Sequence, residues 1–237
     1  MNTDFSTIQK LFVENAFSLT QEQYDAFTIY STFLVEYNQK VNLTAITEPE
    51  EIWKKHFLDS VYPLRYVAIP ENAAVMDVGT GAGFPGVPMA IYRKDLKITM
   101  LDSLQKRLVF LEQLAEKTGL LWWRCVHGRA EDVGNQSEFR EQYDVVTARA
   151  VAALPVLCEY CMPFVKVGGC FLALKGPNES SADARYAISL LGGVVEDEIV
   201  YSLGDEERRL IVIRKISHTP TNYPRKSSRI KQKPLSL

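Results

Sequence analysis

Residues 74–86 read Ala-Val-Met-Asp-Val-Gly-Thr-Gly-Ala-Gly-Phe-Pro-Gly. The apolar run at 74–78 predicts a short strand, and the glycines that follow predict a tight loop leading into a helix. A strand, a glycine-rich loop and a helix in this order place backbone N–H groups and a helix N-terminus beside a ligand. The stretch is therefore typical of a nucleotide-type ligand site in an α/β domain.

The residues after this loop alternate between strand and helix patterns. Strands are predicted at 97–102, 122–126, 143–148 and 169–174, helices at 107–117 and 154–165, and a hairpin from the β-rich runs 194–203 and 209–216. Alternating strands and helices imply a parallel sheet with helices packed on its faces, and the hairpin implies an antiparallel edge. The predicted fold class is α/β, a doubly wound Rossmann-like sheet with an antiparallel C-terminal hairpin.

The first seventy residues carry helical patterns instead. Apolar residues recur at helical spacing over 20–41, and Thr47-Glu48-Pro49-Glu50 is a capping-box signature for a second helix running to about Val61. These patterns divide the chain into a helical N-terminal cap at 1–70, a cofactor-binding domain at 71–216 and a basic tail at 217–237. We expect the three segments to form one compact unit.

Composition is that of a globular protein. The chain has 237 residues, of which 46% are hydrophobic and 24% charged, which excludes a disordered, coiled-coil or collagen-like chain. Four cysteines are too few for a disulfide scaffold and indicate a reducing compartment. No apolar run approaches the length of a membrane helix, and the N-terminus does not resemble a signal peptide. We therefore expect a cytoplasmic protein.

The net charge of −2 conceals an asymmetry. Seven basic residues follow position 213, while no Asp or Glu follows Glu207. The tail is therefore strongly basic and the rest of the chain acidic. A basic arm on an acidic body is typical of polyanion binding, and a tail that is merely solvated is the other interpretation.

Two ligands compete for the glycine loop. Gly81 to Gly86 satisfies the dinucleotide pattern G-x-G-x-x-G, and Asp102 stands at the distance of a ribose-binding acid. However, Asp77 would face a pyrophosphate with like charge, whereas it suits the ammonium and sulfonium of S-adenosylmethionine. Pro85 also disturbs the helix start that a pyrophosphate needs. These residues favour the methyl donor.

Two further acids fit a methyl-donor site. Asp102 ends the second predicted strand, where a carboxylate can accept hydrogen bonds from both ribose hydroxyls. Glu131 follows the third strand and can accept a hydrogen bond from the adenine amino group. A helix N-cap for Asp102 and a solvated loop for Glu131 are the alternatives, but acids at successive strand ends favour a site.

The chain resembles the small-subunit ribosomal RNA guanine-N7 methyltransferases, also called the glucose-inhibited division protein B family. The resemblance spans nearly the whole sequence, and Phe84-Pro85-Gly86 and Ala148-Arg149-Ala150-Val151 are its most specific parts. The remaining matching stretches are Asn42-Leu43-Thr44, His56 to Ser60, Leu101-Asp102-Ser103 with Lys106-Arg107, Gly128 to Glu131, Leu174-Lys175-Gly176 and Tyr223 to Lys226.

The resemblance implies a class I S-adenosylmethionine-dependent enzyme, expected as a monomer, that methylates N7 of a guanine in the 530 loop of 16S rRNA. It implies a cofactor pocket lined by Gly79, Phe84, Asp102, Ser103, Leu104, Ala130, Glu131 and Arg149, to which the glycine loop adds Gly81. Arg149, after the fourth strand, is also the candidate for positioning the base, with a surface ion pair as the alternative. No residue is assigned to chemical catalysis.

Candidates for contacting 16S rRNA come from the helical N-terminal cap, the end of the strand predicted at 169–174 and the basic tail. They are Asn42, His56, Lys175, Arg225, Lys226, Arg229, Lys231 and Lys233. His56 and Asp59 are three residues apart and can share a helix face. The three histidines have no zinc-ligand spacing, so no metal is expected, and Cys158 and Cys161 suit a buried helix better than redox chemistry.

Three other functions stay open at this point. They are a methyltransferase acting on another substrate, a non-catalytic cofactor-binding factor in ribosome assembly, and a nicotinamide oxidoreductase. The basic tail favours a polyanionic substrate over a small molecule, and the cofactor residues favour an enzyme over a binding module.

Overall fold

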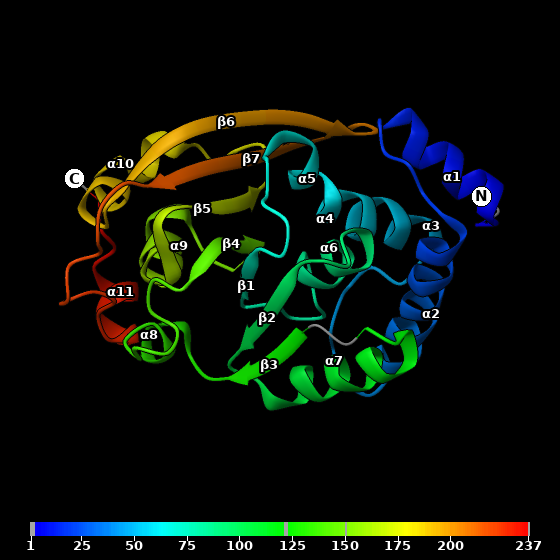
Figure 1. Ribbon diagram of the computed structural model, residues 1–237, viewed down its shortest axis with the longest axis horizontal. Coiled ribbons are helices and arrows are strands. Elements are labelled where there is room, and N and C mark those ends of the chain that lie inside the picture. Colours follow the sequence, from blue (N-terminus) through cyan, green and yellow to red (C-terminus); the bar gives the residue numbers. More distant parts are fainter. Residues whose placement is uncertain (1–2, 121–122, 150, 237) are drawn as a thin grey trace.

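The computed structural model describes residues 3–120, 123–149 and 151–236 (Figure 1). In these residues one sheet has the strand order β3-β2-β1-β4-β5-β7-β6. The strands are β1 Ala74–Val78, β2 Lys97–Asp102, β3 Trp123–His127, β4 Tyr143–Arg149, β5 Val165–Lys175, β6 Gly193–Leu203 and β7 Glu206–Lys215. Strands β1 to β5 pair in parallel, whereas β7 pairs antiparallel with both β5 and β6. The predicted doubly wound sheet with an antiparallel hairpin is confirmed.

Helices cover both faces of the sheet (Figure 1). One face carries α1 Phe5–Glu14, α2 Gln21–Asn38, α3 Pro49–Glu51, the π-helical segment η1 Ile52–Leu58, α4 Asp59–Val61, α5 Pro63–Tyr66, α6 Gly86–Tyr92 and α7 Gln105–Thr118. The other carries α8 Ala130–Val133, α9 Leu154–Cys161, α10 Arg185–Leu190 and α11 Ser227–Gln232, with short 3₁₀ turns at Met162–Phe164 and Ser181–Ala184. None of these described helices is long and apolar enough to cross a membrane.

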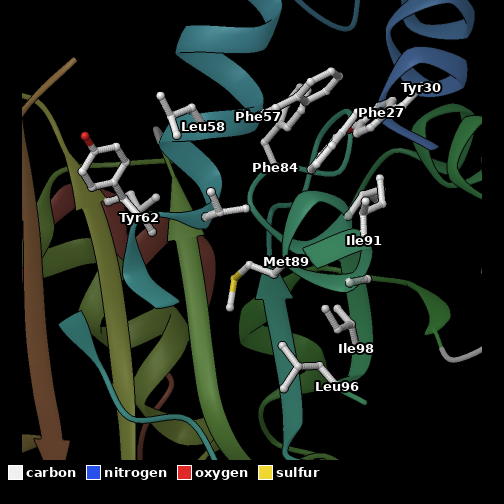
Figure 2. Close-up of a cluster of buried hydrophobic side chains, with 14 of the residues drawn as sticks. Phe27, Tyr30, Phe57, Leu58, Tyr62, Phe84, Met89, Ile91, Leu96 and Ile98 are labelled. Atoms are coloured by element: carbon white, nitrogen blue, oxygen red, sulfur yellow. The ribbon is translucent and has the colours of Figure 1, made fainter. Parts of the chain in front are cut away.

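The sheet separates two hydrophobic cores because successive strand residues point to opposite faces. Val75 packs into the first core and its neighbour Met76 into the second. The first core also holds Phe27 and Phe57 from the N-terminal helices (Figure 2). The N-terminal helices thus share a core with the sheet, and the division at residue 70 stays a prediction about segments of one chain.

Several element boundaries differ from the sequence expectation. The helix predicted over 154–165 ends at Cys161, and β5 begins at Val165, four residues before the predicted start. Gly168, just before the predicted start, lies within the strand at φ +87°. The helix predicted from residue 47 to Val61 is interrupted by η1, whose wider turn no local pattern indicates. Trp122, predicted to open β3, lies outside the described residues.

The basic tail is docked onto the protein rather than extended into solvent. Ile230 of α11 is fully buried in the second core, and Leu235 packs there too. The guanidinium of Arg225 donates to the buried carboxylate of Glu159 at 2.8 and 2.6 Å. Apolar residues between the tail cations thus anchor the segment to the protein, and binding of a polyanion by its exposed cations stays a prediction.

Candidate functional site

Asp77 stabilises the glycine loop through hydrogen bonds to buried donors. Its buried carboxylate accepts hydrogen bonds from Thr80 Oγ1 at 2.6 Å, Thr147 Oγ1 at 3.1 Å and the Gly86 N–H at 3.1 Å. Burial raises the pKa of Asp77 to about 6, although these three donors oppose the shift. Asp77 is fully buried and therefore does not face a ligand, so the predicted contact with the cofactor's cationic groups is wrong.

The same contact bears on which nucleotide the loop holds. In a dinucleotide site the amides that open the helix after the loop bind a pyrophosphate. Here the Gly86 amide, at the start of α6, is used by the protein's own carboxylate. A Cβ at residue 86 would lie 3.0 Å from Asp77 Oδ2 and 2.8 Å from Met100 Sδ, so only glycine allows this approach.

A cavity of about 660 Å³ opens at the carboxyl ends of β1, β2 and β3. Its walls are Val78, Gly79, Leu101, Asp102, Ser103, Arg107, Gly128, Arg129, Ala130, Glu131, Val151, Ala152, Val156, Tyr160, Ser227 and Lys231. We call it the cofactor cavity, because its position matches the crevice that ligands occupy in doubly wound sheets. Of the predicted cofactor residues, Gly79, Asp102, Ser103, Ala130 and Glu131 line it.

The acids of this cavity can serve a nucleoside. Asp102 is buried at the end of β2 and lines the cavity. Glu131 is also buried, and its Oε1 lies 4.0 Å from Arg129 Nη1, beyond hydrogen-bond distance. Glu131 therefore keeps the capacity to accept a hydrogen bond from an amino group. This pair of acids fits the ribose and adenine of S-adenosylmethionine.

Four predicted cofactor residues do not line this cavity. Gly81 and Leu104 instead orient Asp102, since each donates its backbone N–H to that carboxylate at 2.9 Å. Phe84 is buried between two rings, 5.4 Å from Tyr30 and 4.3 Å from His56 between centroids. Figure 2 shows Phe84 beside Tyr30 and Phe57 in the first core. The fourth residue, Arg149, faces a different cavity.

This second cavity, of about 350 Å³, lies at the carboxyl ends of β4 and β5. We call it the acceptor cavity; its walls are Ile46, Lys55, His56, Asp59, Arg149, Leu174, Lys175, Gly176, Glu179, Tyr201 and Arg208. The two cavities are neighbours, because the Ala152 carbonyl accepts a hydrogen bond from the Lys175 ammonium. Ala152 lines the cofactor cavity and Lys175 the acceptor cavity.

Arg149 lines the acceptor cavity and contacts several of its other residues. Its Nη1 donates to Asp59 Oδ2 at 3.0 Å and to the Lys55 carbonyl at 3.1 Å. Its guanidinium carbon lies 4.7 Å from the centroid of the Phe84 ring, a cation–π distance. Asp59 also accepts from the Tyr201 hydroxyl at 2.8 Å. The guanidinium is thereby fixed in place, which suits a group that orients a ligand.

His56 is held neutral beside this arginine. Burial and the positive charge of Arg149 lower the pKa of His56 to about 3. Arg149 Nη2 lies 3.1 Å from His56 Nδ1, which must accept because a guanidinium can only donate. The ring proton is therefore on Nε2, which donates to Thr44 Oγ1 at 2.8 Å. The segment η1 and the start of α4 place His56 and Asp59 on one side, which their spacing predicted, and both contact Arg149, which it did not.

The predicted RNA-contacting residues fall into two groups. Lys226, Arg229, Lys231 and Lys233 are exposed on and beside α11, and Asn42 is exposed in the loop after α2. The side chains of Lys175 and Arg225 are instead largely covered and paired, with Glu179 and Glu159 respectively, and that of His56 is buried. Contact with RNA stays a prediction for all of them, although Arg225 already has a structural partner.

Sequence reasoning missed residues that the C-terminal elements bring to the cavities. Tyr201 and Arg208 come from the β6–β7 hairpin to the acceptor cavity, and Ser227 from α11 to the cofactor cavity. No local pattern marks them, because strand and helix docking alone place them there. Ala150, in the specific motif around Arg149, lies outside the described residues.

The family model and the curated relatives indicate the same family. The family model for rRNA small subunit methyltransferase G, GidB, matches residues 23–211. A protein of Acetivibrio thermocellus named ribosomal RNA small subunit methyltransferase G is 48% identical over 236 residues, covering 97% of each chain. One of the same name from Lactobacillus acidophilus is 48% identical over 225 residues, covering 92% of this chain and 94% of the other.

Solved structures share the fold at low sequence identity. TrmN from Thermus thermophilus matches with a TM-score of 0.53 and 19% identity, covering 67% of this chain and 48% of the other. A SAM-dependent methyltransferase from Aquifex aeolicus matches with a TM-score of 0.53 and 16% identity, covering 70% and 93%. With the family match over most of its length, this chain belongs to the rRNA small subunit methyltransferase G family.

Proposed function

We propose that this protein methylates N7 of a guanine in the 530 loop of 16S rRNA, with S-adenosylmethionine as the methyl donor. Membership of the rRNA small subunit methyltransferase G family supports ribosomal RNA as the substrate. The single observation that carries the proposal is the pair of neighbouring cavities at the carboxyl edge of the sheet. One suits a nucleoside cofactor, and the other presents fixed cations to a base.

In this proposal the cofactor cavity holds the methyl donor through its acids. Asp102 accepts from ribose, Glu131 accepts from the adenine amino group, and the backbone at Gly79 borders the methionyl end. S-adenosylmethionine supplies an electrophilic methyl group when bound. The residues of the cavity therefore bind and orient, and none has to transfer a proton.

The acceptor cavity provides what a guanine needs for attack through N7. N7 has a free lone pair and no proton, so no general base is required, and alignment supplies the catalysis. Because N7 carries no proton, His56 does not have to act as a base, and its hydrogen bonds to Arg149 and Thr44 are compatible with a positioning role. Arg149 and Lys175 can donate to the O6 edge and to phosphate oxygens, and a loop base can leave its stack to enter the cavity.

A methyl-transfer assay tests this function. Small ribosomal subunits from cells lacking the protein are incubated with labelled S-adenosylmethionine, and the rRNA is mapped by cleavage at N7-methylguanine. We expect one cleavage site, in the 530 loop. Label at another position would keep the enzyme class and overturn the target. Cofactor binding without label transfer would instead favour a non-catalytic role in assembly.

The same preparations test the expected monomer and its RNA partner. Sedimentation of the free protein should give the mass of one chain, 26.8 kDa. Naked 16S rRNA and assembled small subunits, assayed side by side, would show which form the enzyme accepts.

A further inference from the structure

Arg107 forms an ion pair with Asp102, the acid that is proposed to bind ribose. It lies in the first turn of α7 and lines the cofactor cavity. Its Nη1 donates to Asp102 Oδ2 at 3.2 Å, and its side chain is 32% exposed. This contact places a cation against the carboxylate on the cavity side.

The acceptor positions of Asp102 are nearly all taken. A carboxylate offers about four lone-pair sites, two on each oxygen. Oδ2 accepts from the Gly81 N–H and from Arg107, whereas Oδ1 accepts from the Leu104 N–H. One site is left on Oδ1 and none on Oδ2. A ribose diol donating to both oxygens therefore has to replace one of the present donors.

Arg107 is the donor that is easiest to replace. The Gly81 and Leu104 amides belong to the backbone of the loops and bind at 2.9 Å, a shorter distance than that of Arg107. Arg107 Nε is buried and has no hydrogen-bond partner among the described residues, so the guanidinium is not well satisfied where it lies. The first turn of α7 also has no acidic residue, and a cation there opposes the helix dipole.

We propose that Arg107 competes with the ribose of the cofactor for Asp102 Oδ2 and leaves that oxygen when a ribose hydroxyl takes its position. This inference rests on the proposed binding of an adenosine cofactor in this cavity. Arg107 accordingly weakens the binding of the cofactor and of its demethylated product. A weaker hold on the product favours its release.

Calorimetric titration with 5′-methylthioadenosine and S-adenosylhomocysteine tests the inference. 5′-Methylthioadenosine has no formal charge, so removal of a cation cannot act on it through simple repulsion. We expect Arg107→Ala to bind 5′-methylthioadenosine about three- to tenfold more tightly than wild type, the range of one hydrogen bond. Arg107→Lys keeps a cation that can pair with Asp102, so its affinity should stay close to that of wild type.

The 2′-deoxy and 3′-deoxy analogues of 5′-methylthioadenosine show which ribose hydroxyl takes the position of Arg107. The analogue lacking the hydroxyl that replaces Arg107 should bind wild type and Arg107→Ala equally well. Arg93→Ala is the control, because Arg93 is exposed to nearly the same degree as Arg107 but pairs with Asp95, away from the cavity. It should leave every affinity unchanged.

Equal or weaker binding by a folded Arg107→Ala would overturn the inference and make Arg107 a residue that orients Asp102. Thermal unfolding of the variant shows whether it is folded. Failure of the wild type to bind S-adenosylhomocysteine would overturn the proposed cofactor site itself, so the two failures are distinguishable.

Discussion

The Asp77 carboxylate accepts the Gly86 N–H at 3.1 Å, joining the end of β1 to the start of α6 across the glycine loop. Thr80 Oγ1 donates to the same oxygen from inside the loop, at 2.6 Å. One buried acid thus stabilises the conformation of the loop that borders the cofactor cavity. The N–H groups of the loop itself are used within the protein, since those of Gly79 and Thr80 donate to the Leu101 carbonyl and that of Gly81 to Asp102.

Asp77→Ala should destabilise the protein and abolish cofactor binding. The variant leaves the Gly86 N–H without an acceptor, while Thr80 Oγ1 and Thr147 Oγ1 keep only longer contacts, at 3.3 Å to Met100 Sδ and 3.5 Å to the Met76 carbonyl. We expect these losses to cost about 2–4 kcal/mol of unfolding free energy. Denaturant unfolding and calorimetry with S-adenosylhomocysteine measure the two effects. Asp144→Ala is the control: Asp144 accepts from the Ala74 N–H at the opposite end of β1 and is less buried. If both variants kept full cofactor affinity, Asp77 would have no role in the site.

Arg149→Ala should separate methyl transfer from cofactor binding. Arg149 lines the acceptor cavity and not the cofactor cavity, so we expect turnover to fall about 100-fold while S-adenosylhomocysteine binds as before. The variant leaves Asp59 with the Tyr201 hydroxyl, which should keep the protein folded with some loss of stability. An equal loss of cofactor affinity would instead place Arg149 in cofactor binding, as its family position implied.

His56 should make the protein sensitive to acid. Its pKa is about 3 in the folded protein against 6.5 as the reference value, so the unfolded chain binds the proton first. The stability from His56 is complete above pH 6.5 and is lost as the pH falls toward 3, at about 1.4 kcal/mol per pH unit. His56→Gln should therefore have a flatter dependence of unfolding free energy on pH between 4 and 6. Parallel curves for the two proteins would contradict the neutral, buried histidine.

The Arg225–Glu159 pair should stabilise the docked tail. The two side chains are 14% and 1% exposed, and removal of one partner from such a pair typically costs about 3–5 kcal/mol. Arg214→Ala removes an Arg–Glu pair of similar length that is 34% and 43% exposed, for which we expect about 0–1 kcal/mol. Denaturant unfolding of Arg225→Ala and Arg214→Ala measures the two losses of unfolding free energy. Equal costs would mean that Arg225 does not anchor the tail.

The exposed tail cations should contribute to the salt dependence of RNA binding. Lys226, Arg229, Lys231 and Lys233 are exposed, and each phosphate contact contributes about 0.7–0.9 to the slope of log K against log salt. Replacing all four with Gln should reduce the slope by about 3 if every one meets a phosphate. Fluorescence anisotropy with a fragment containing the 530 loop measures this slope. An unchanged slope would mean that these four side chains are only solvated.

A second fourfold variant controls for net charge. It replaces exposed lysines away from the carboxyl edge of the sheet, namely Lys10, Lys94, Lys97 and Lys117, with Gln. It has the same net charge as the tail variant, so a smaller change in slope would assign the difference to the position of the tail.

Local patterns in the sequence were sufficient to predict the fold class and five of the residues that line the cofactor cavity. Hydrophobic periodicity and glycine spacing act over a few residues, so they placed β1, the glycine loop and the acids Asp102 and Glu131 at successive strand ends. In a parallel sheet those ends meet at one edge, and the cavity follows from the strand order.

The direction in which each polar side chain points depended on residues far away in the chain. Asp77 turns inward because Thr147 and Gly86 offer donors there, and Arg149 meets Asp59 across 90 positions of sequence. The tail docks because Glu159 is buried opposite Arg225. Burial and pairing are properties of the packed molecule, so charge counted along the chain could indicate a basic arm but not which of its cations were already paired.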